Sequence, residues 1–280
     1  MKLSRPALAF LASVVALRAT AADWAPQLTA TATWEENATN ANQAVDRVDA
    51  LQLATSLMIE QRAGLTRELA LLYGAQLEAE SWPRFDQLDR IAAGPTLALR
   101  YKDGLGPLAP TFTLRAAGTL SAARDFGRAG PAGSLSLIYA QGLTDTTHLT
   151  AGVTGTRLDA HESVYARSDV EGFVECAYDF DANWRLRLSA RWRHGDVLSY
   201  ATPPRPDLVG LARERTDNDT FAPSMFVYSL DAHTVSGAVL LSRALDEATS
   251  LNLGVEWRET TRTPLLYVNR LVSLGVTRQF

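Results

Sequence analysis

Leu271-Val-Ser-Leu-Gly-Val-Thr-Arg-Gln-Phe280 is the stretch that decides the fold of this 280-residue chain. Val272, Leu274 and Val276 recur with a period of two, while small or polar residues occupy the positions between them. Successive side chains of a β-strand point to opposite faces, so the pattern predicts a strand with one apolar face and one polar face.

The same alternation recurs along the chain and predicts eleven more strands. Apolar residues alternate with small or polar ones over 28–34, 51–59, 69–77, 97–101, 112–116, 135–139, 149–153, 170–178, 184–192, 226–242 and 251–257. In 226–242 the apolar phase changes from Tyr228 and Leu230 to Val235, Val239 and Leu241, and a β-bulge near His233 would explain a slip of one residue. The register of that strand is therefore left open.

The connections between these segments alternate in length. Short connections cover 61–66, 103–106, 142–145, 180–182 and 245–248, and longer ones cover 36–48, 82–90, 122–131, 158–167 and 195–220. Only 259–264 breaks the alternation, because it is short where a long loop is expected. Short turns at one end and long loops at the other are typical of a transmembrane barrel.

We therefore predict an all-β chain that forms a transmembrane antiparallel up-and-down β-barrel of twelve strands over residues 22–280. Residues 22–280 contain no run of 18 apolar residues, and a chain without such a run can cross a bilayer only as a closed barrel. A soluble β-sandwich is the alternative, because alternating strands with turn signals suit that class too.

Residues 1–21 are expected to be a secretory signal peptide. Lys2 and Arg5 precede a short apolar run from Ala7 to Leu17, and Ala19-Thr20-Ala21 fits a cleavage site. Cleavage would remove three of the 27 basic residues and none of the 31 acidic ones, which leaves a net charge of −7. That charge gives no indication of a nucleic-acid partner. Cys176 is the only cysteine, so no internal disulfide is possible.

The final segment resembles the C-terminal signature of bacterial outer-membrane β-barrels, which ends in an aromatic residue preceded by alternating apolar residues. Phe280, Val276, Leu274 and Val272 match it, and Arg278 departs from it because an apolar or aromatic residue is usual there. The resemblance implies porin-like architecture in the bacterial outer membrane. It also implies contact with outer-membrane lipid and lipopolysaccharide, and recognition of the segment by the barrel-assembly machinery. With the short turns on the periplasmic side, both termini are expected to be periplasmic.

The predicted interior carries charged residues from neighbouring strands. Arg185, Arg187, Arg191 and Arg193 alternate with the apolar face of 184–192, and Glu171 and Glu175 do so on the preceding strand. A turn centred on Asp181 would place Glu175 opposite Arg187 and Glu171 opposite Arg191. With Arg100 and Arg115, these residues are the candidate pore-lining set. They would form either a neutralised structural network or a selective lining.

Three functions remain open from the sequence. The first is a small passive porin-like channel for small solutes, anionic ones included, with no cofactor and no metal. The second is an outer-membrane lipid-modifying enzyme, for which His161 and Ser163 are the nearest motif, although they lie in a predicted loop. The third is a non-conducting structural or assembly barrel, which bulky inward residues such as Met58, Leu72 and Phe173 would favour. The long loop 195–220 is expected to be solvated, with a lid or constriction as the alternative.

The aromatic residues are expected to form two belts at the two membrane interfaces. One belt would include Trp34, Trp192, Tyr228 and Tyr267 near the long-loop ends of the strands. The other would include Tyr101, Tyr178, Trp184 and Phe280 near the short-turn ends.

Overall fold

The computed structural model describes residues 24–280, and the predicted signal peptide lies outside this range. Thirteen strands form a single sheet, and short helices occur only in the loops. The strands are β1 (Trp24–Glu35), β2 (Ala50–Gly64), β3 (Leu69–Ser81), β4 (Arg90–Lys102), β5 (Thr111–Ala123), β6 (Gly130–Gly142), β7 (Thr147–Leu158), β8 (Arg167–Asp179), β9 (Trp184–Ala201), β10 (Glu214–Asp217), β11 (Phe226–Ala244), β12 (Thr249–Arg262) and β13 (Leu265–Gln279). No helix within residues 24–280 is long and apolar enough to cross a membrane.

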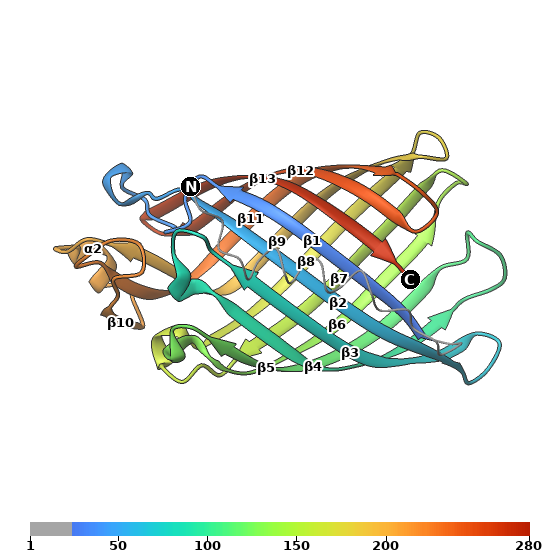
Figure 1. The fold of residues 1–280 in the computed structure, drawn as a ribbon, viewed down its shortest axis with the longest axis horizontal. Helices are drawn as coiled ribbons and strands as arrows, with labels where there is room; N and C mark the ends of the chain where they lie inside the picture. Colours follow the sequence, from blue (N-terminus) through green and yellow to red (C-terminus); the bar gives the residue numbers. More distant parts are fainter. Residues whose placement is uncertain (1–23) are drawn as a thin grey trace.

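Twelve of these strands close into an antiparallel barrel (Figure 1). Each strand pairs with its neighbour in sequence, β9 pairs with β11, and β13 pairs with β1 to complete the ring. The closing register places Leu28 opposite Arg278 and Trp34 opposite Val272. The predicted strand number, the antiparallel up-and-down order and the closing pair are thus confirmed. The short β10 pairs only with the outer part of β11.

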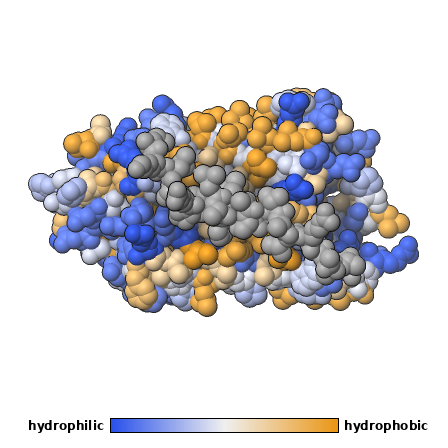
Figure 2. Space-filling model, in the orientation of Figure 1, coloured by the Kyte–Doolittle hydropathy of each residue, from blue (hydrophilic) through white to orange (hydrophobic). Residues whose placement is uncertain are grey.

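The apolar face of the wall points outward, as the alternation predicted. Leu97, Leu137, Leu188, Val239 and Val255 are all exposed although they lie in the middle of strands. On the face shown in Figure 2, apolar residues gather over the middle of the barrel and hydrophilic residues gather at both ends. An outward apolar band between two polar ends is the surface that a bilayer requires.

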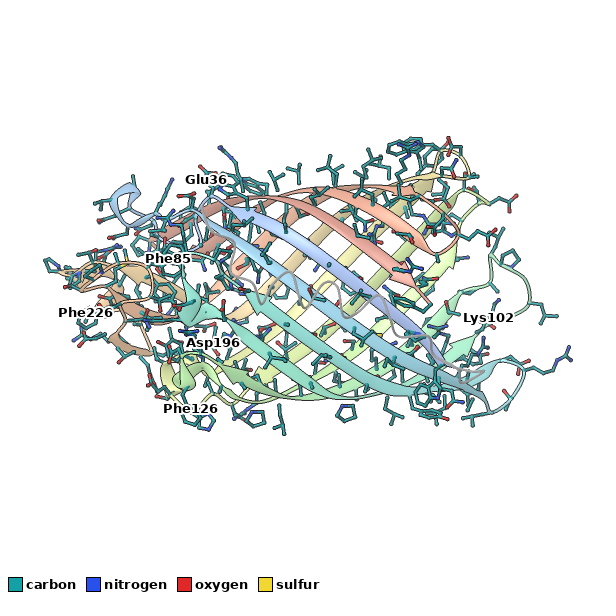
Figure 3. All side chains as sticks on the ribbon, in the orientation of Figure 1. Glu36, Phe85, Lys102, Phe126, Asp196 and Phe226 are labelled. Carbon is teal, nitrogen blue, oxygen red and sulfur yellow. The ribbon has the colours of Figure 1, made fainter. Side chains whose placement is uncertain are left out.

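The two ends of the barrel differ in the size of their connections. One end carries the turns 65–68, 143–146, 180–183 and 245–248, and Trp24 and Phe280 lie there too. The connection predicted as the short turn 103–106 also lies at this end, but it extends over 103–110. The other end carries the long loops 36–49, 82–89, 124–129, 159–166 and 202–225. Figure 3 shows Lys102 at the first end and Phe85, Phe126, Asp196 and Phe226 at the second. We call the end with the short turns the short-turn end and the end with the long loops the long-loop end.

The predicted bulge near His233 is absent from β11. Its pairing with β9 runs without interruption from Phe226, opposite Ala201, to Arg243, opposite Trp184. Tyr228 and Leu230 are buried on the inner face, whereas Val235 and Val239 are exposed on the outer face. The bulge prediction was wrong because the apolar residues change sides while the register stays constant.

The long-loop end contains a packed apolar cluster, to which β9, β11 and β13 contribute inward side chains. Ala201, Leu208, Tyr228, Leu230, Leu265 and Tyr267 form a buried cluster there. Tyr228 and Tyr267 were therefore wrongly assigned to an interfacial belt. The predicted solvated loop 195–220 is also partly wrong, since β9 extends to Ala201 and the loop contains α2 (Pro206–Val209) and β10.

Candidate functional site: the barrel lumen

The inside of the barrel contains a series of cavities that share lining residues. A cavity of about 540 Å³ lies at the short-turn end, and Arg187 joins it to a cavity of about 510 Å³ in the middle. Glu35, Gln52 and Arg258 line both the middle cavity and one of about 370 Å³ at the long-loop end. These shared walls place the three cavities end to end along the barrel.

Toward the short-turn end, the opposite side of the lumen is filled. The inward side chains of Ala70, Leu72, Thr96, Ala98 and Thr113 on β3, β4 and β5 are buried. Beside them, Arg115 donates to Glu60 at 2.7 Å, and its second nitrogen lies 3.8 Å from the Met58 sulfur. Arg115 is thus part of this packing, and the free space beside it runs along β1, β9 and β11–β13. Nearer the long-loop end, a further cavity of about 360 Å³ lies beside β3–β8.

The arginines of β9 form ion pairs with β8, but not in the predicted register. Glu171 lies opposite Arg193, and Glu175 lies opposite Ser189. The turn centres on Ala182, one residue later than predicted, with the Asp181 carboxylate accepting from the backbone nitrogens of Asn183 and Trp184. The expected partners still meet diagonally, since Arg187 lies 3.8 Å from Glu175 and Arg191 lies 3.4 Å from Glu171.

Arg185 is also neutralised. Its guanidinium contacts both carboxylate oxygens of Asp179, at 2.5 and 2.9 Å, in the bidentate geometry that arginine and carboxylate favour. Three of the four predicted β9 arginines, Arg185, Arg187 and Arg191, are therefore paired. Arg193 is the exception: within residues 24–280 no carboxylate oxygen lies within 4.0 Å of it.

Arg193 belongs to a cluster of three arginines. Arg90 on β4, Arg167 on β8 and Arg193 all line both the 370 Å³ cavity and the adjoining one of about 360 Å³. Arg90 contacts Glu80 at 2.6 Å, whereas Arg167, like Arg193, forms no ion pair with any residue from 24 to 280. We call Arg90, Arg167 and Arg193 the arginine cluster.

Arg90 and Arg167 were missed because the predicted strands 97–101 and 170–178 begin too late. Both residues were placed in loops, yet each is the first residue of its strand. The signal was present in the sequence, since Arg167, Asp169 and Glu171 share one face of a continuous alternation. Arg100 lies elsewhere, on the same inward face of β4 but near its short-turn end, next to Ala70 and Thr113.

The residues of the predicted assembly signal lie on the outer face. Val272, Leu274, Val276 and Phe280 are exposed along the lipid-facing side of β13. The Arg278 guanidinium lies 5.2 Å from the centre of the Phe280 ring. Arg278, the one residue that differs from the usual signature, thus forms a cation–π contact with the terminal aromatic ring. Recognition of this segment by an assembly machinery stays a prediction.

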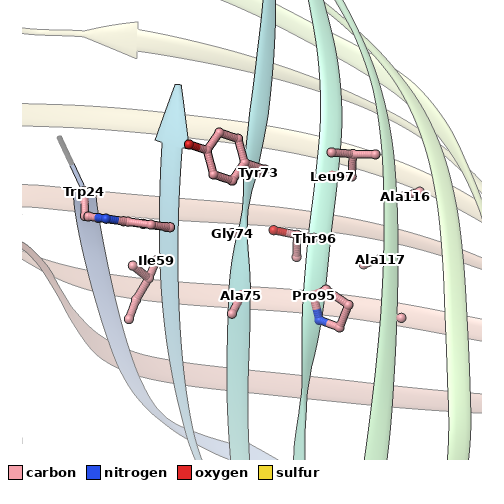
Figure 4. Close-up of a pocket in the computed structure, with 11 residues that line it drawn as sticks. Trp24, Ile59, Tyr73, Gly74, Ala75, Pro95, Thr96, Leu97, Ala116 and Ala117 are labelled. Atoms are coloured by element: carbon pink, nitrogen blue, oxygen red, sulfur yellow. The ribbon is translucent and has the colours of Figure 1, made fainter. Parts of the chain in front are cut away.

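A second hollow lies on the lipid-facing side of the wall (Figure 4). Trp24, Ile59, Tyr73, Pro95 and Leu97 surround it. At its floor the backbone of β4 approaches β5 so closely that a Cβ on Gly94 would lie 1.9 Å from the Gly118 carbonyl oxygen. The hollow is a shallow depression where small residues leave the outer surface of the wall unfilled. Among its lining residues, only Ala117 also lines a lumen cavity described above.

His161 and Ser163, the candidate residues for a lipid-modifying enzyme, do not contact each other. The His161 ring contacts the Ala129 carbonyl, and Ser163 donates to Glu214. His161 and Ser163 are therefore each engaged elsewhere, and the serine–histidine pair that a nucleophilic mechanism requires is not formed.

Comparison with known proteins agrees with this architecture. No protein-family model matches the chain, and no curated protein resembles it significantly in sequence. The fold is similar to that of the COG4313 outer membrane channel from Pseudomonas putida F1, with a TM-score of 0.60 and 11% identity over 92% of this chain and 95% of that chain. The NanC porin matches with a TM-score of 0.48 and 8% identity, covering 90% of this chain and 100% of that one. The chain thus shares the closed β-barrel fold of the COG4313 channel structure.

Proposed function

We propose that the protein is a passive outer-membrane channel for small solutes, with a preference for anions. The short-turn end would face the periplasm and the long-loop end the exterior. The observation that carries the proposal is the arginine cluster. Arg167 and Arg193 carry charges without ion-pair partners in residues 24–280, and they lie in the wall of the cavities at the long-loop end.

The electrostatics favour an anion at this place. Unpaired guanidinium groups attract anions, and the low-dielectric walls of a narrow lumen concentrate their field. Arg185, Arg187 and Arg191 contribute less, because each has a carboxylate partner. A solute would diffuse from the arginine cluster past Glu35 and Arg258 to Arg187, without any chemical step.

The test is single-channel recording of the refolded protein in planar bilayers, with ion selectivity measured from the reversal potential in a KCl gradient. We expect discrete conductance steps and a reversal potential on the chloride side. The double variant Arg167→Gln/Arg193→Gln should move that potential toward zero. The double variant Arg84→Gln/Arg270→Gln is the matched control, because it removes the same charge from exposed sites at the same end.

Two results would count against the proposal. A folded protein that shows no conductance steps would exclude the channel. A conducting protein whose selectivity is the same in both double variants would exclude the arginine cluster as the source of anion preference.

A further inference from the structure

The connection between β1 and β2, which we call loop 1 (residues 36–49), does not stay above its own hairpin. Its ends are close, since Glu35 pairs with Ala50. Its middle instead contacts β9, which is separated from β1 in the barrel by β13, β12 and β11. Loop 1 therefore runs from one side of the long-loop end to another.

One backbone and two side-chain hydrogen bonds join loop 1 to β9. The Tyr200 backbone nitrogen donates to the Thr39 carbonyl at 2.8 Å, the Asn40 side chain donates to the Leu198 carbonyl at 3.0 Å, and the Ser199 hydroxyl donates to the Asn40 carbonyl at 2.8 Å. β8 pairs with β9 only as far as Gly195, so the edge of β9 beyond that point is open. Loop 1 satisfies backbone groups that this edge would otherwise leave unpaired.

Loop 1 is buried and fastened at two further points. Asn37, Thr39, Ala41 and Asp46 have almost no exposed surface. The Asn37 backbone nitrogen donates to the side chain of Asn269 on β13 at 3.1 Å.

The third fastening is a buried ion pair with the loop between β9 and β11. Arg205 lies 3.1 Å from Asp46, and their side chains are 3% and 1% exposed. Arg205 also donates to the Asn42 side chain at 2.6 Å, and the Thr202 backbone donates to Asp46 at 3.0 Å. Separating such a pair would leave an uncompensated charge out of water, which is strongly unfavourable. The two loops are thus held together as one rigid unit.

This unit lies over the lumen. Ala38 and Asn40 of loop 1 line the 370 Å³ cavity together with Arg167, Arg193 and Tyr200. We propose that loop 1 is a fixed constriction that sets the size of the solutes able to reach the arginine cluster. This inference rests on the proposed channel function. It assigns the size limit of the channel to the residues of loop 1.

Narrowing the constriction is the first test. Ala38→Trp adds an indole to the wall of the cavity, and we expect the single-channel conductance to fall severalfold. The matched control is Asp49→Asn in the same loop, because Asp49 forms only an exposed pair with Arg84 at 3.8 Å. Far-UV circular dichroism would show that each variant keeps its strand content.

The second test widens the constriction by removing loop 1. Because Glu35 and Ala50 are already paired, a two-residue turn such as Asn-Gly can replace loop 1 and close the β1–β2 hairpin. We expect higher conductance and faster swelling of proteoliposomes in neutral oligosaccharides that the unmodified protein excludes. The sign of the ion selectivity should not change, since the arginine cluster remains.

The outcomes separate this inference from the proposed function. If the unmodified protein conducts and both loop variants keep its conductance and size limit, loop 1 is not the constriction. If only the loop-deleted protein conducts, loop 1 closes the lumen: the proposed channel function of the unmodified protein fails, whereas the placement of loop 1 across the lumen is supported. If neither conducts, the channel itself is excluded, and loop 1 has no flow to limit.

Discussion

The two halves of β11 differ in which faces of one uninterrupted strand are covered by apolar side chains. In the wall, Val235 and Val239 point outward and Ser236 points inward. Toward the long-loop end, Tyr228 and Leu230 point inward and are completely buried. Val227, on the other face of the same half, is buried as well, in a second apolar cluster with Tyr165 and Tyr200. The positions of the apolar residues therefore report the surroundings of each half: an apolar exterior around a wet lumen in one, and a core packed on both faces in the other.

The packed half is the place where a loss of volume should cost most. Leu230→Ala should destabilise the long-loop end by about 2–5 kcal/mol, because Leu230 has no exposed surface and its neighbours cannot close the space fully. Unfolding in guanidinium would measure the loss of folding free energy, and the rate of protease cleavage within 202–225 would show that the loss is local to the long-loop end. Val239→Ala is the control, since lipid replaces the lost contacts there. Equal losses in both variants would contradict the comparison.

The wall half should be the more sensitive to charge. Val239→Arg places a guanidinium on the outer face of mid-strand β11 and should cost about 2–4 kcal/mol of folding free energy in a bilayer. Ala238→Arg puts the same group one residue away in the middle lumen cavity, where water solvates it. Urea titration of folding into lipid vesicles should therefore separate the two variants. If Ala238→Arg is as destabilising as Val239→Arg, the assignment of the two faces is wrong.

The inward ion pairs of the wall should contribute little by comparison. Glu175 and Arg187 are 3.8 Å apart and partly exposed to the lumen. A double-mutant cycle with Glu175→Gln and Arg187→Gln should give a coupling free energy of about 0.2–1 kcal/mol. A coupling free energy of several kcal/mol would mean that the wall interior is dry, like the packed half of β11.

The smallest expected effect is a pH dependence confined to the long-loop end. Hydrogen bonds from the Arg205 guanidinium hold the pKa of Asp207 below its usual range. The folded-state pKa is depressed, so this stabilisation is present above the usual aspartate pKa and disappears as the pH falls through the depressed value. Hydrogen exchange around α2, corrected for the intrinsic rate, should accelerate below about pH 4. Exchange in the β3–β5 wall should not follow this change, and a parallel change there would contradict a local cause.

The barrel itself could be predicted from the sequence because a period of two is a local signal. All twelve barrel strands, the closing pair of β1 with β13 and the outward apolar face follow from it. The β8–β9 register was missed by two residues because hydrogen bonds of the Asp181 side chain set the turn. No periodicity encodes such a contact.

The candidate site was less predictable than the wall. Arg193 was identified as a pore-lining residue, but Arg90 and Arg167 were assigned to loops, so the cluster was not seen. The contact of loop 1 with β9 joins Asn40 to Leu198, which lie 158 residues apart in sequence. Tertiary packing decides such contacts, and the alternation of a single strand carries no information about them.

The central claim is that water and solutes pass along β9, while the β3–β5 side of the lumen is filled toward the short-turn end. In a Cys176→Ser background, Ser189→Cys places a thiol in the middle cavity, and Ala70→Cys places one in the filled side. Single-channel current should fall when a water-soluble, sulfonate-bearing thiol reagent is added to Ser189→Cys, and it should stay constant for Ala70→Cys. A block of Ala70→Cys, or an unchanged current through Ser189→Cys after mass spectrometry shows that it is labelled, would contradict the claim.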